Sequence, residues 1–163
     1  MGSTLHGLVM FRTAAAAFAL PVEDVREVVP VARLSAPPQM SSVVEGILNL
    51  AGVAVPVLRL DRLLGLSDAR FGLDASILIM RGEPTFGLLV EHVDGVRDAS
   101  TFAIMAVAEG ASFNGCLVAE LEHGGLRAHL LSWARLLLAE ERVRMAEFQA
   151  QAQARLAEAA EAP

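Results

Sequence analysis

Residues 44–65 read VEGILNLAGVAVPVLRLDRLLG, the stretch of the chain that says most about its fold. It holds two apolar runs, Ile47–Leu50 and Val53–Leu58, joined by the pair Ala51-Gly52. Two short apolar runs around a turn predict a β-hairpin, and the leucine-rich stretch after them predicts a short helix. The segment has no side-chain pattern typical of catalysis, so it favours a protein that acts through its surface.

The composition limits the classes of protein that the chain can belong to. Its 163 residues suit one compact domain or two small halves that share a core. The chain has 13 basic and 19 acidic residues, a net charge of -6 and no basic run, which disfavours nucleic-acid binding. Seven phenylalanines, one tryptophan and no tyrosine leave few platforms on which bases could stack.

Cysteine use and the lengths of the apolar runs predict a cytoplasmic protein. Cys116 is the only cysteine, so no internal disulfide can form and a reducing compartment is the simplest interpretation. The run Ala14–Leu20 loosely resembles the core of a signal peptide, but another apolar run, Leu8–Phe11, precedes it, and two strands of a hairpin explain both better. No apolar run approaches the roughly 20 residues that cross a bilayer, so no membrane insertion is expected.

The chain carries an internal echo. Phe18–Val28 reads FALPVEDVREV and Phe86–Val96 reads FGLLVEHVDGV, with Phe, Leu, Val, Glu, Val and Val at the same offsets. A looser echo follows in the same order and matches Gly46 with Gly115 and Arg62 with Arg135. Two echoes in one order predict a duplicated architecture.

Apolar periodicity and turn residues predict ten short strands. Turn compositions such as Gly82-Glu83-Pro84 separate neighbouring runs. The predicted strands are Leu8–Arg12, Ala16–Leu20, Glu27–Leu34, Ile47–Leu50, Val53–Leu58, Ser76–Arg81, Thr85–Val90, Val93–Asp98, Cys116–Leu121 and Leu126–Leu131. Short strands at regular spacing are typical of small β-barrels, so the predicted fold class is mainly β.

The C-terminal part has a different character. From the predicted N-cap Ser132 no turn residue occurs until Pro163, which predicts one helix over Trp133–Ala160. The residues expected to dock on the strands are Trp133, Leu136, Leu137 and Leu138. A second set, spaced by three and four, shares one face: Met145, Phe148, Ala152 and Leu156. Two interpretations stay open, an exposed fraying helix and a helix that packs on a partner or on a second copy of itself.

Side chains that could carry chemistry are scattered. The four histidines (His6, His92, His123 and His129) lack the spacing of metal ligands, so no metal site is expected. The sequence contains no phosphate-binding loop and no nucleophile elbow, and no cofactor is expected. Glu23 and Glu91 occupy the same slot in the two echoes. Such a pair could be two cooperating carboxylates, but capping of a short turn is the favoured interpretation, and an enzyme is not expected.

These segments resemble the CheW-like domain family, the adaptors of bacterial chemosensory arrays. The resemblance rests on residues 18–29, 44–52, 56–66 and 87–96 in family order, and the Gly-Ile-Leu-Asn-Leu-x-Gly piece followed by Pro-Val is its most specific part. It covers residues 5–139 and leaves residues 140–163 as a helical tail. The implied fold is two five-stranded SH3-like β-barrel subdomains with a C-terminal α-helical extension.

The resemblance also implies a function. Members of the family are non-catalytic adaptors that couple the cytoplasmic tip of a methyl-accepting chemoreceptor to the regulatory domain of a histidine kinase. A receptor helix lies in an apolar groove near the seam between the barrels, and the matched positions here are Val25, Glu27 and the turn Asn49–Gly52. The alternative is a small-molecule or peptide-binding double barrel outside chemotaxis, which a seam pocket with convergent polar groups would favour.

Two departures from the family pattern lie in the opening segment. Ala51 stands where the family usually has arginine, and Arg59-Leu60-Asp61 stands where it tends to read Asp-Leu-Arg. Two residues apart on a strand, Arg59 and Asp61 share a face and are expected to form an exposed ion pair that contributes about 0–1 kcal/mol and alters partner choice. Neutral drift on a solvated surface is the alternative. The expected partner-binding residues are therefore Val25, Glu27, Asn49, Ala51, Gly52, Arg59 and Asp61.

Overall fold

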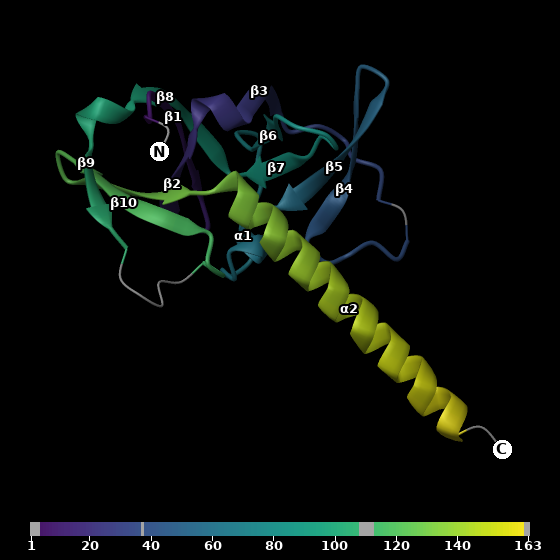
Figure 1. The fold of residues 1–163 in the computed structure, drawn as a ribbon. Helices are drawn as coiled ribbons and strands as arrows, with labels where there is room; N and C mark the ends of the chain where they lie inside the picture. The colour runs from purple at the N-terminus through teal and green to yellow at the C-terminus, as the bar shows by residue number, and fades with distance from the viewer. Residues whose placement is uncertain (1–3, 37, 108–112, 162–163) are drawn as a thin grey trace.

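The structure, a computed structural model, describes residues 4–36, 38–107 and 113–161 (Figure 1). Its strands are β1 Gly7–Thr13, β2 Ala16–Pro21, β3 Val25–Pro30, β4 Val44–Leu50, β5 Val53–Arg59, β6 Ser76–Met80, β7 Gly87–Val90, β8 His92–Asp98, β9 Ala103–Ala106, β10 Leu117–His123 and β11 Leu126–Leu131. Its α-helices are α1 Leu60–Leu63 and α2 Trp133–Glu161, and its 3-10 turns are η1 Val22–Asp24 and η2 Ala99–Thr101.

The strands form two sheets, which stand side by side in Figure 1. The first has the order β8-β1-β2-β11-β10-β9 and the second has the order β3-β6-β7-β5-β4. The predicted mainly β fold of two SH3-like subdomains with a C-terminal helix is therefore confirmed. In the described residues one sheet has six strands instead of five, because β9 pairs along the outer edge of β10.

The two sheets repeat one strand order, which confirms the predicted duplication. The order β8-β1-β2-β11-β10 matches the order β3-β6-β7-β5-β4 position by position. In both sheets the central contact is parallel, between β2 and β11 in one and between β7 and β5 in the other. The first half of the chain supplies β1 and β2 to the six-stranded sheet, and the second half supplies β6 and β7 to the five-stranded sheet. The two halves of the chain meet where β8 pairs with β1 and where β3 pairs with β6.

Of the two residue matches in the looser echo, the match of Arg62 with Arg135 is confirmed and the match of Gly46 with Gly115 is wrong. Arg62 and Arg135 lie at matching places, each nine residues after the first residue of its strand, Val53 or Leu126. The match of Gly46 with Gly115 was wrong. The pairs Leu50↔Val53 and His123↔Leu126 close equivalent hairpins. Gly46 lies four residues before Leu50, and the residue four before His123 is Ala119, so Gly46 is equivalent to Ala119. The similar residues around Gly46 and Gly115 therefore do not occupy equivalent positions in the two sheets.

Some predicted strand ends also differ from the structure. The strand predicted over Glu27–Leu34 ends at Pro30, and beyond it Ser35 makes an isolated bridge to Ile47 on the edge of β4. β9 was not predicted, because four residues without flanking turn residues carry little signal. Gly46 permits the Ser35 bridge, since a Cβ at this position would lie 2.6 Å from the carbonyl oxygen of Ser35.

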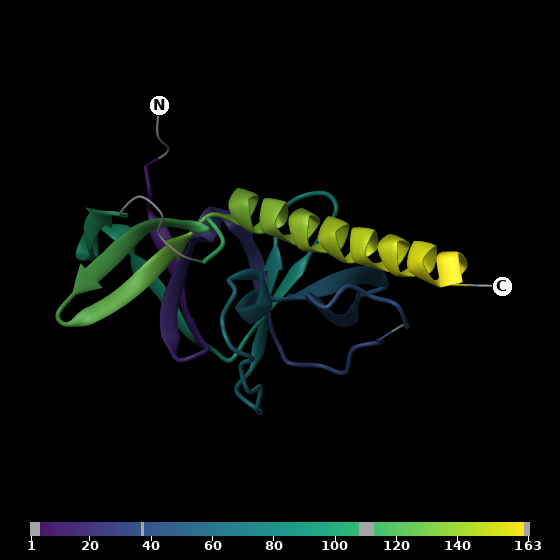
Figure 2. The same cartoon turned by 90° about the horizontal axis from the view of Figure 1, so that it is seen from below.

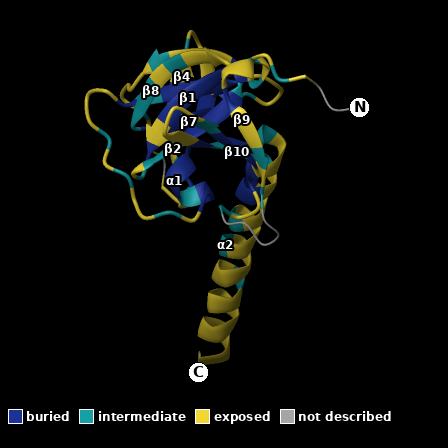
Figure 3. Cartoon of the chain, turned by 90° about the vertical axis from the view of Figure 1, so that its left-hand side faces the viewer, coloured by how far each residue is buried: buried dark blue, intermediate teal, exposed yellow. Residues whose placement is uncertain are grey.

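Three hydrophobic clusters explain why the strands are dense in apolar residues. On β1, Leu8 and Met10 point into a cluster inside the six-stranded half, while Val9 and Phe11 point into a large cluster shared by both halves. β6 repeats this division, with alternate residues facing the shared cluster and a cluster inside the five-stranded half. Both faces of these strands are thus buried, as the dark strands of Figure 3 show, and continuous apolar runs result.

Helix α2 begins where the two halves meet and runs out beyond the five-stranded half (Figures 1 and 2). Ser132 caps it as predicted, because its hydroxyl accepts a hydrogen bond from the Arg135 amide at 3.3 Å. Leu136 and Ala139 are buried in the shared cluster, whereas Leu138 is 54% exposed, so its predicted docking was wrong. Within the described residues, no helix is both long enough and apolar enough to cross a membrane.

Candidate partner-binding surface

An apolar groove lies at the seam between the two halves, and we call it the seam groove. Its volume is about 530 Å³. Two links between elements build it, the η1 turn from β2 to β3 and the Ser132 link from β11 to α2. The lining residues are Leu5, Pro21, Asp24, Val118, Leu130, Leu131, Ser132, Trp133, Ala134 and Leu137.

Trp133 and Asp24 give the seam groove its specific features. The Trp133 ring meets the edge of Phe86 with the ring centroids 6.2 Å apart, which braces α2 against the five-stranded half. Burial, followed by the charge of Glu23, raises the pKa of Asp24 above its ordinary value. The groove is thus an apolar surface with a carboxyl group at one side.

The turn between β4 and β5 projects from the sheet as an exposed tip. Ala51 and Gly52 have φ values of 49° and 86°, and the amide of Gly52 donates to the Asn49 side-chain oxygen at 2.9 Å. Positive φ at both central residues of a two-residue hairpin is the geometry that Asn-Gly favours. Ala51 occupies this left-handed conformation at a cost of about 1 kcal/mol.

Replacing Ala51 by asparagine is therefore expected to stabilise the protein. We expect Ala51→Asn to raise the free energy of unfolding by about 0.5–1 kcal/mol in urea denaturation, because asparagine tolerates the left-handed region. Ala54→Asn is the matched control, since Ala54 is also exposed but lies within β5, where asparagine is disfavoured. A loss of stability in Ala51→Asn would contradict the turn geometry.

Arg59 and Asp61 form an ion pair, but the expectation that the pair is exposed was wrong. Arg59 is 7% exposed and Asp61 is 0% exposed. Arg59 ends β5 and Asp61 lies in α1, and the guanidinium donates to both carboxylate oxygens at 3.0 and 2.7 Å. Such a bidentate pair holds the strand and the helix in one orientation.

Residues outside the hairpin and α1 bury this pair. The amide of Ala69 donates to Asp61 at 2.8 Å, and the Phe71 ring lies 4.8 Å from the Arg59 guanidinium carbon. Burial raises the pKa of Asp61, but the hydrogen bonds from Arg59 and Ala69 and the charge of Arg59 outweigh it, so the pKa is lowered overall. Asp61 therefore stays ionised inside the protein.

The outer side of this charge cluster is acidic. Glu45 accepts from Arg59 at 3.1 Å with 39% of its side chain exposed, and Asp68 bridges to Arg62 with 65% exposed. Arg62 also donates to the carbonyl oxygen of Ser42 at 2.6 Å. A partner would therefore meet the carboxylates of Glu45 and Asp68 here, while the charge of Arg59 is neutralised internally.

Arg62 and its counterpart Arg135 perform the same structural task in the two halves. Arg62 donates to the carbonyl of Ser42, and Arg135 donates to the carbonyl of Gly115 at 3.3 Å. The equivalent strands β5 and β11 begin at Val53 and Leu126, which are 73 residues apart. Ser42 and Gly115 are also 73 residues apart, so they occupy equivalent positions in the two halves. Each arginine thus ties its helix to the chain that leads into the preceding hairpin.

The structure distributes the predicted partner-binding residues over three places. Val25 begins β3 beside the seam groove but is buried in the shared cluster, while Glu27 is exposed on β3. The Asn49–Gly52 turn lies at the start of β5, and Arg59 lies at the end of that strand. β3 and β4 are at opposite edges of the hydrogen-bonded order, with three strands between them. In the described residues, side-chain hydrogen bonds within this set join only Asn49 to Gly52 and Arg59 to Asp61.

The seam groove itself was missed at the residue level. Trp133 and Leu137 were predicted to dock on the barrels, and that signal could have located one wall of the groove. Pro21 and Val118 carried no signal, because the two links that bring them together belong to different parts of the chain.

The side chains considered for catalysis have structural roles or lie apart. Glu91 accepts a hydrogen bond from the amide of Ala14 at 2.7 Å, which confirms the favoured interpretation that it satisfies a turn. Glu23 is exposed in η1. No group of three or more histidine, cysteine, aspartate or glutamate side chains in the part of the chain that the structure describes could hold a metal ion. Cys116 is buried, and this burial raises the pKa of its thiol.

Comparisons with known proteins agree with this geometry. The model of the CheW-like domain family matches residues 7–139. The fold is similar to that of the scaffolding protein TtCheW from Thermoanaerobacter tengcongensis, with a TM-score of 0.72 and 22% identity over 83% of this chain and 89% of that chain. No curated protein matches the sequence.

Proposed function

The chain belongs to the CheW-like domain family, and from this premise we propose that it is a non-catalytic adaptor in a chemosensory signalling complex. In this proposal it couples the cytoplasmic tip of a methyl-accepting chemoreceptor to the regulatory domain of a histidine kinase, and it works in the cytoplasm. Residues 5–139 form the adaptor domain and residues 140–163 form its tail, although helix α2 continues without a break across residue 139.

The seam groove is the observation that carries the proposal. An apolar groove of about 530 Å³ walled on one side by a helix suits the apolar face of a second helix. Asp24 offers a carboxyl group to a donor on that helix. Among the described residues that line the groove, only Asp24, Ser132 and the indole N–H of Trp133 bring polar side-chain atoms, so the groove gives little support to the small-molecule alternative.

We assign the predicted site residues different roles within this proposal. Glu27, Asn49, Ala51 and Gly52 are exposed and are proposed to contact partners directly. Val25, Arg59 and Asp61 are buried, so we propose that they act by holding β3, β5 and α1 in position.

Binding measurements with both partners test the proposal. Isothermal titration calorimetry with a receptor-tip fragment and with an isolated kinase regulatory domain should give saturable binding to each, without turnover of any added nucleotide. Binding to neither partner would overturn the proposed adaptor function.

A carboxylate placed in the seam groove is expected to weaken receptor binding. Ala134 is exposed, lines the groove and lies in the first turn of α2, where an acidic residue is compatible with the helix dipole. We expect Ala134→Glu to weaken binding of the receptor-tip fragment by about tenfold, equivalent to about 1.4 kcal/mol. Ala154→Glu, on the same helix but beyond the groove, is the matched control and should leave the affinity unchanged. Equal affinities for the two variants would place the receptor elsewhere.

A further inference from the structure

Helix α2 has two opposite faces, and its own domain covers one of them. At about 3.6 residues per turn, Leu136, Ala139 and Glu140 share a face with Val143 and Glu147. The first three are buried, and Val143 packs against the shared cluster. Glu147 continues this face, because its carboxylate accepts hydrogen bonds from the amide and hydroxyl of Ser42.

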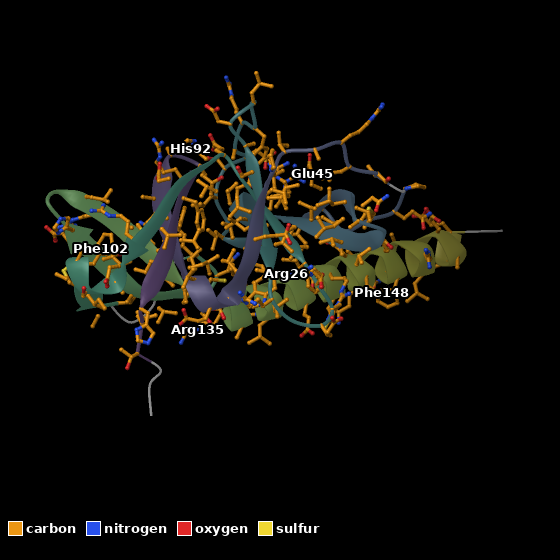
Figure 4. All side chains as sticks on the ribbon, turned by 90° about the horizontal axis from the view of Figure 1, so that it is seen from above. Arg26, Glu45, His92, Phe102, Arg135 and Phe148 are labelled. Carbon is orange, nitrogen blue, oxygen red and sulfur yellow. The ribbon has the colours of Figure 1, made fainter. Side chains whose placement is uncertain are left out.

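The opposite face carries an exposed apolar row, which we call the outer stripe. Leu138, Met145, Phe148 and Leu156 are 54%, 63%, 69% and 64% exposed, respectively. Ala152, which is half-buried between its helical neighbours, completes the row at spacings of three and four. Figure 3 shows most of this part of α2 as exposed, and Figure 4 labels Phe148 on it. The fold of one chain thus leaves the outer stripe uncovered.

We propose that the outer stripe binds the outer stripe of a second copy of this chain, with the two α2 helices antiparallel. The seven-residue step from Met145 to Ala152, with Phe148 between them, supplies the seam of a helix pair. An antiparallel pair with its two-fold axis near Gln151 sets Arg144 of each helix level with Glu158 of the other, which gives two opposite-charge pairs.

The same register brings the apolar residues of the two stripes together. Phe148 of one helix lies in height between Ala152 and Leu156 of the other, and symmetry repeats this contact on the other side of the axis. Met145 lies within one residue of Leu156 of the other helix in height. The bulky residues of the two stripes therefore pack against each other along the overlap.

Charge disfavours the parallel alternative. In a parallel pair each residue meets its own copy, so Glu141 would face Glu141 and Arg155 would face Arg155 beside the stripe. Like charges in close contact oppose association. In the antiparallel register Arg155 is level with Glu147 of the other helix and Glu141 is level with Glu161. By helical spacing Glu147 and Glu161 lie on the docked sides of their helices, so like charges do not meet at the stripe.

The position of the stripe leaves room for the second copy. It lies opposite the docked face of α2, so the partner helix does not compete with the shared cluster. The overlap spans residues 141–161, a length of about 30 Å at roughly 1.5 Å per residue. The seam groove, formed at Trp133–Leu137, lies outside this overlap. A contact of this size is at the low end for specific interfaces, so we expect a dissociation constant in the micromolar range.

Sedimentation equilibrium of the full chain over a range of concentrations tests the inference, independently of the proposed adaptor function. We expect a monomer–dimer equilibrium that Ala152→Glu weakens by at least about tenfold. Ala154→Glu is the matched control, because Ala154 is an exposed alanine on the opposite face of the same helix, and it should shift the dissociation constant less than about twofold. Circular dichroism should show equal helix content in both variants.

Charge reversal tests the orientation. Glu158→Arg and Arg144→Glu should each weaken the dimer, and the double variant should restore it, because only the antiparallel register sets these two residues against each other. A wild-type chain that stays monomeric up to about 1 mM, or equal effects of Ala152→Glu and Ala154→Glu, would overturn the proposed dimer. Weakening without restoration in the double variant would overturn the antiparallel register.

Discussion

Replacing Asp61 by alanine is expected to lower the free energy of unfolding by about 3 kcal/mol. The substitution leaves the guanidinium of Arg59, which is 7% exposed, without its bidentate partner. It also removes the acceptor of the Ala69 amide. Glu45 still pairs with Arg59 at 3.1 Å, which keeps the expected loss at the lower end of the range for a broken buried pair. Urea denaturation followed by far-ultraviolet circular dichroism measures the change.

Asp68→Ala is the matched control for this prediction. Asp68 belongs to the same charge cluster, but 65% of its side chain is exposed, so its loss should cost about 0–1 kcal/mol. Similar losses in the two variants would show that burial does not distinguish these carboxylates.

The Asp61 pair also predicts a pH dependence. Because the folded state lowers the pKa of Asp61 below its ordinary value of 3.8, the unfolded chain takes up this proton first as the pH falls. The contribution of the pair is complete at neutral pH and is lost as the pH drops below about 4. Asp61→Asn should therefore flatten the fall in stability below this pH, compared with the wild-type chain.

Replacing Leu136 by alanine is the second prediction with a large effect. Leu136 is 0% exposed and belongs to the cluster shared by both halves, so we expect Leu136→Ala to destabilise the protein by about 2–5 kcal/mol. The loss should be global, because the same cluster joins both sheets to α2. A urea transition at lower concentration, with α2 and the sheets unfolding together, is the expected result.

Leu138→Ala is the matched control for this prediction, because it makes the same substitution on the same helix. Leu138 lies two residues further along α2 and is 54% exposed, so at low protein concentration its truncation should change the stability by less than about 0.5 kcal/mol. If Leu138→Ala destabilised the chain as much as Leu136→Ala does, the docking orientation of α2 would be wrong.

Local sequence patterns were sufficient where the structure depends on neighbours along the chain. The hairpin around Ala51-Gly52, the duplication of Phe18–Val28 and the helix from Trp133 were all predicted, because turns, strand periodicity and caps are short-range properties. The family resemblance then supplied the barrel architecture. β9 was missed, since its four residues pair with β10 without a local signal of their own.

The candidate site depended more on contacts between segments that belong to different sequence patterns. Arg59 and Asp61 were correctly paired from their spacing, yet their burial comes from Ala69 and Phe71, which fold back over α1. The seam groove likewise requires Pro21 and Trp133 to meet across two separate links. Such contacts follow from how each sheet combines strands of both halves of the chain, β1 and β2 with β8–β11 in one and β3–β5 with β6 and β7 in the other, and no periodicity in a single segment encodes that combination.

By itself the sequence determined that this protein is a duplicated, mainly β member of its family with a long C-terminal helix, because apolar spacing, turns and caps act over a few residues. Only the tertiary structure decided that the exchanged charges of Arg59 and Asp61 face inward, and that Leu138 and Phe148 face outward. The reason is physical: the burial of a side chain is set by the segments that pack over it, and here those segments lie outside the short sequence pattern that contains the side chain.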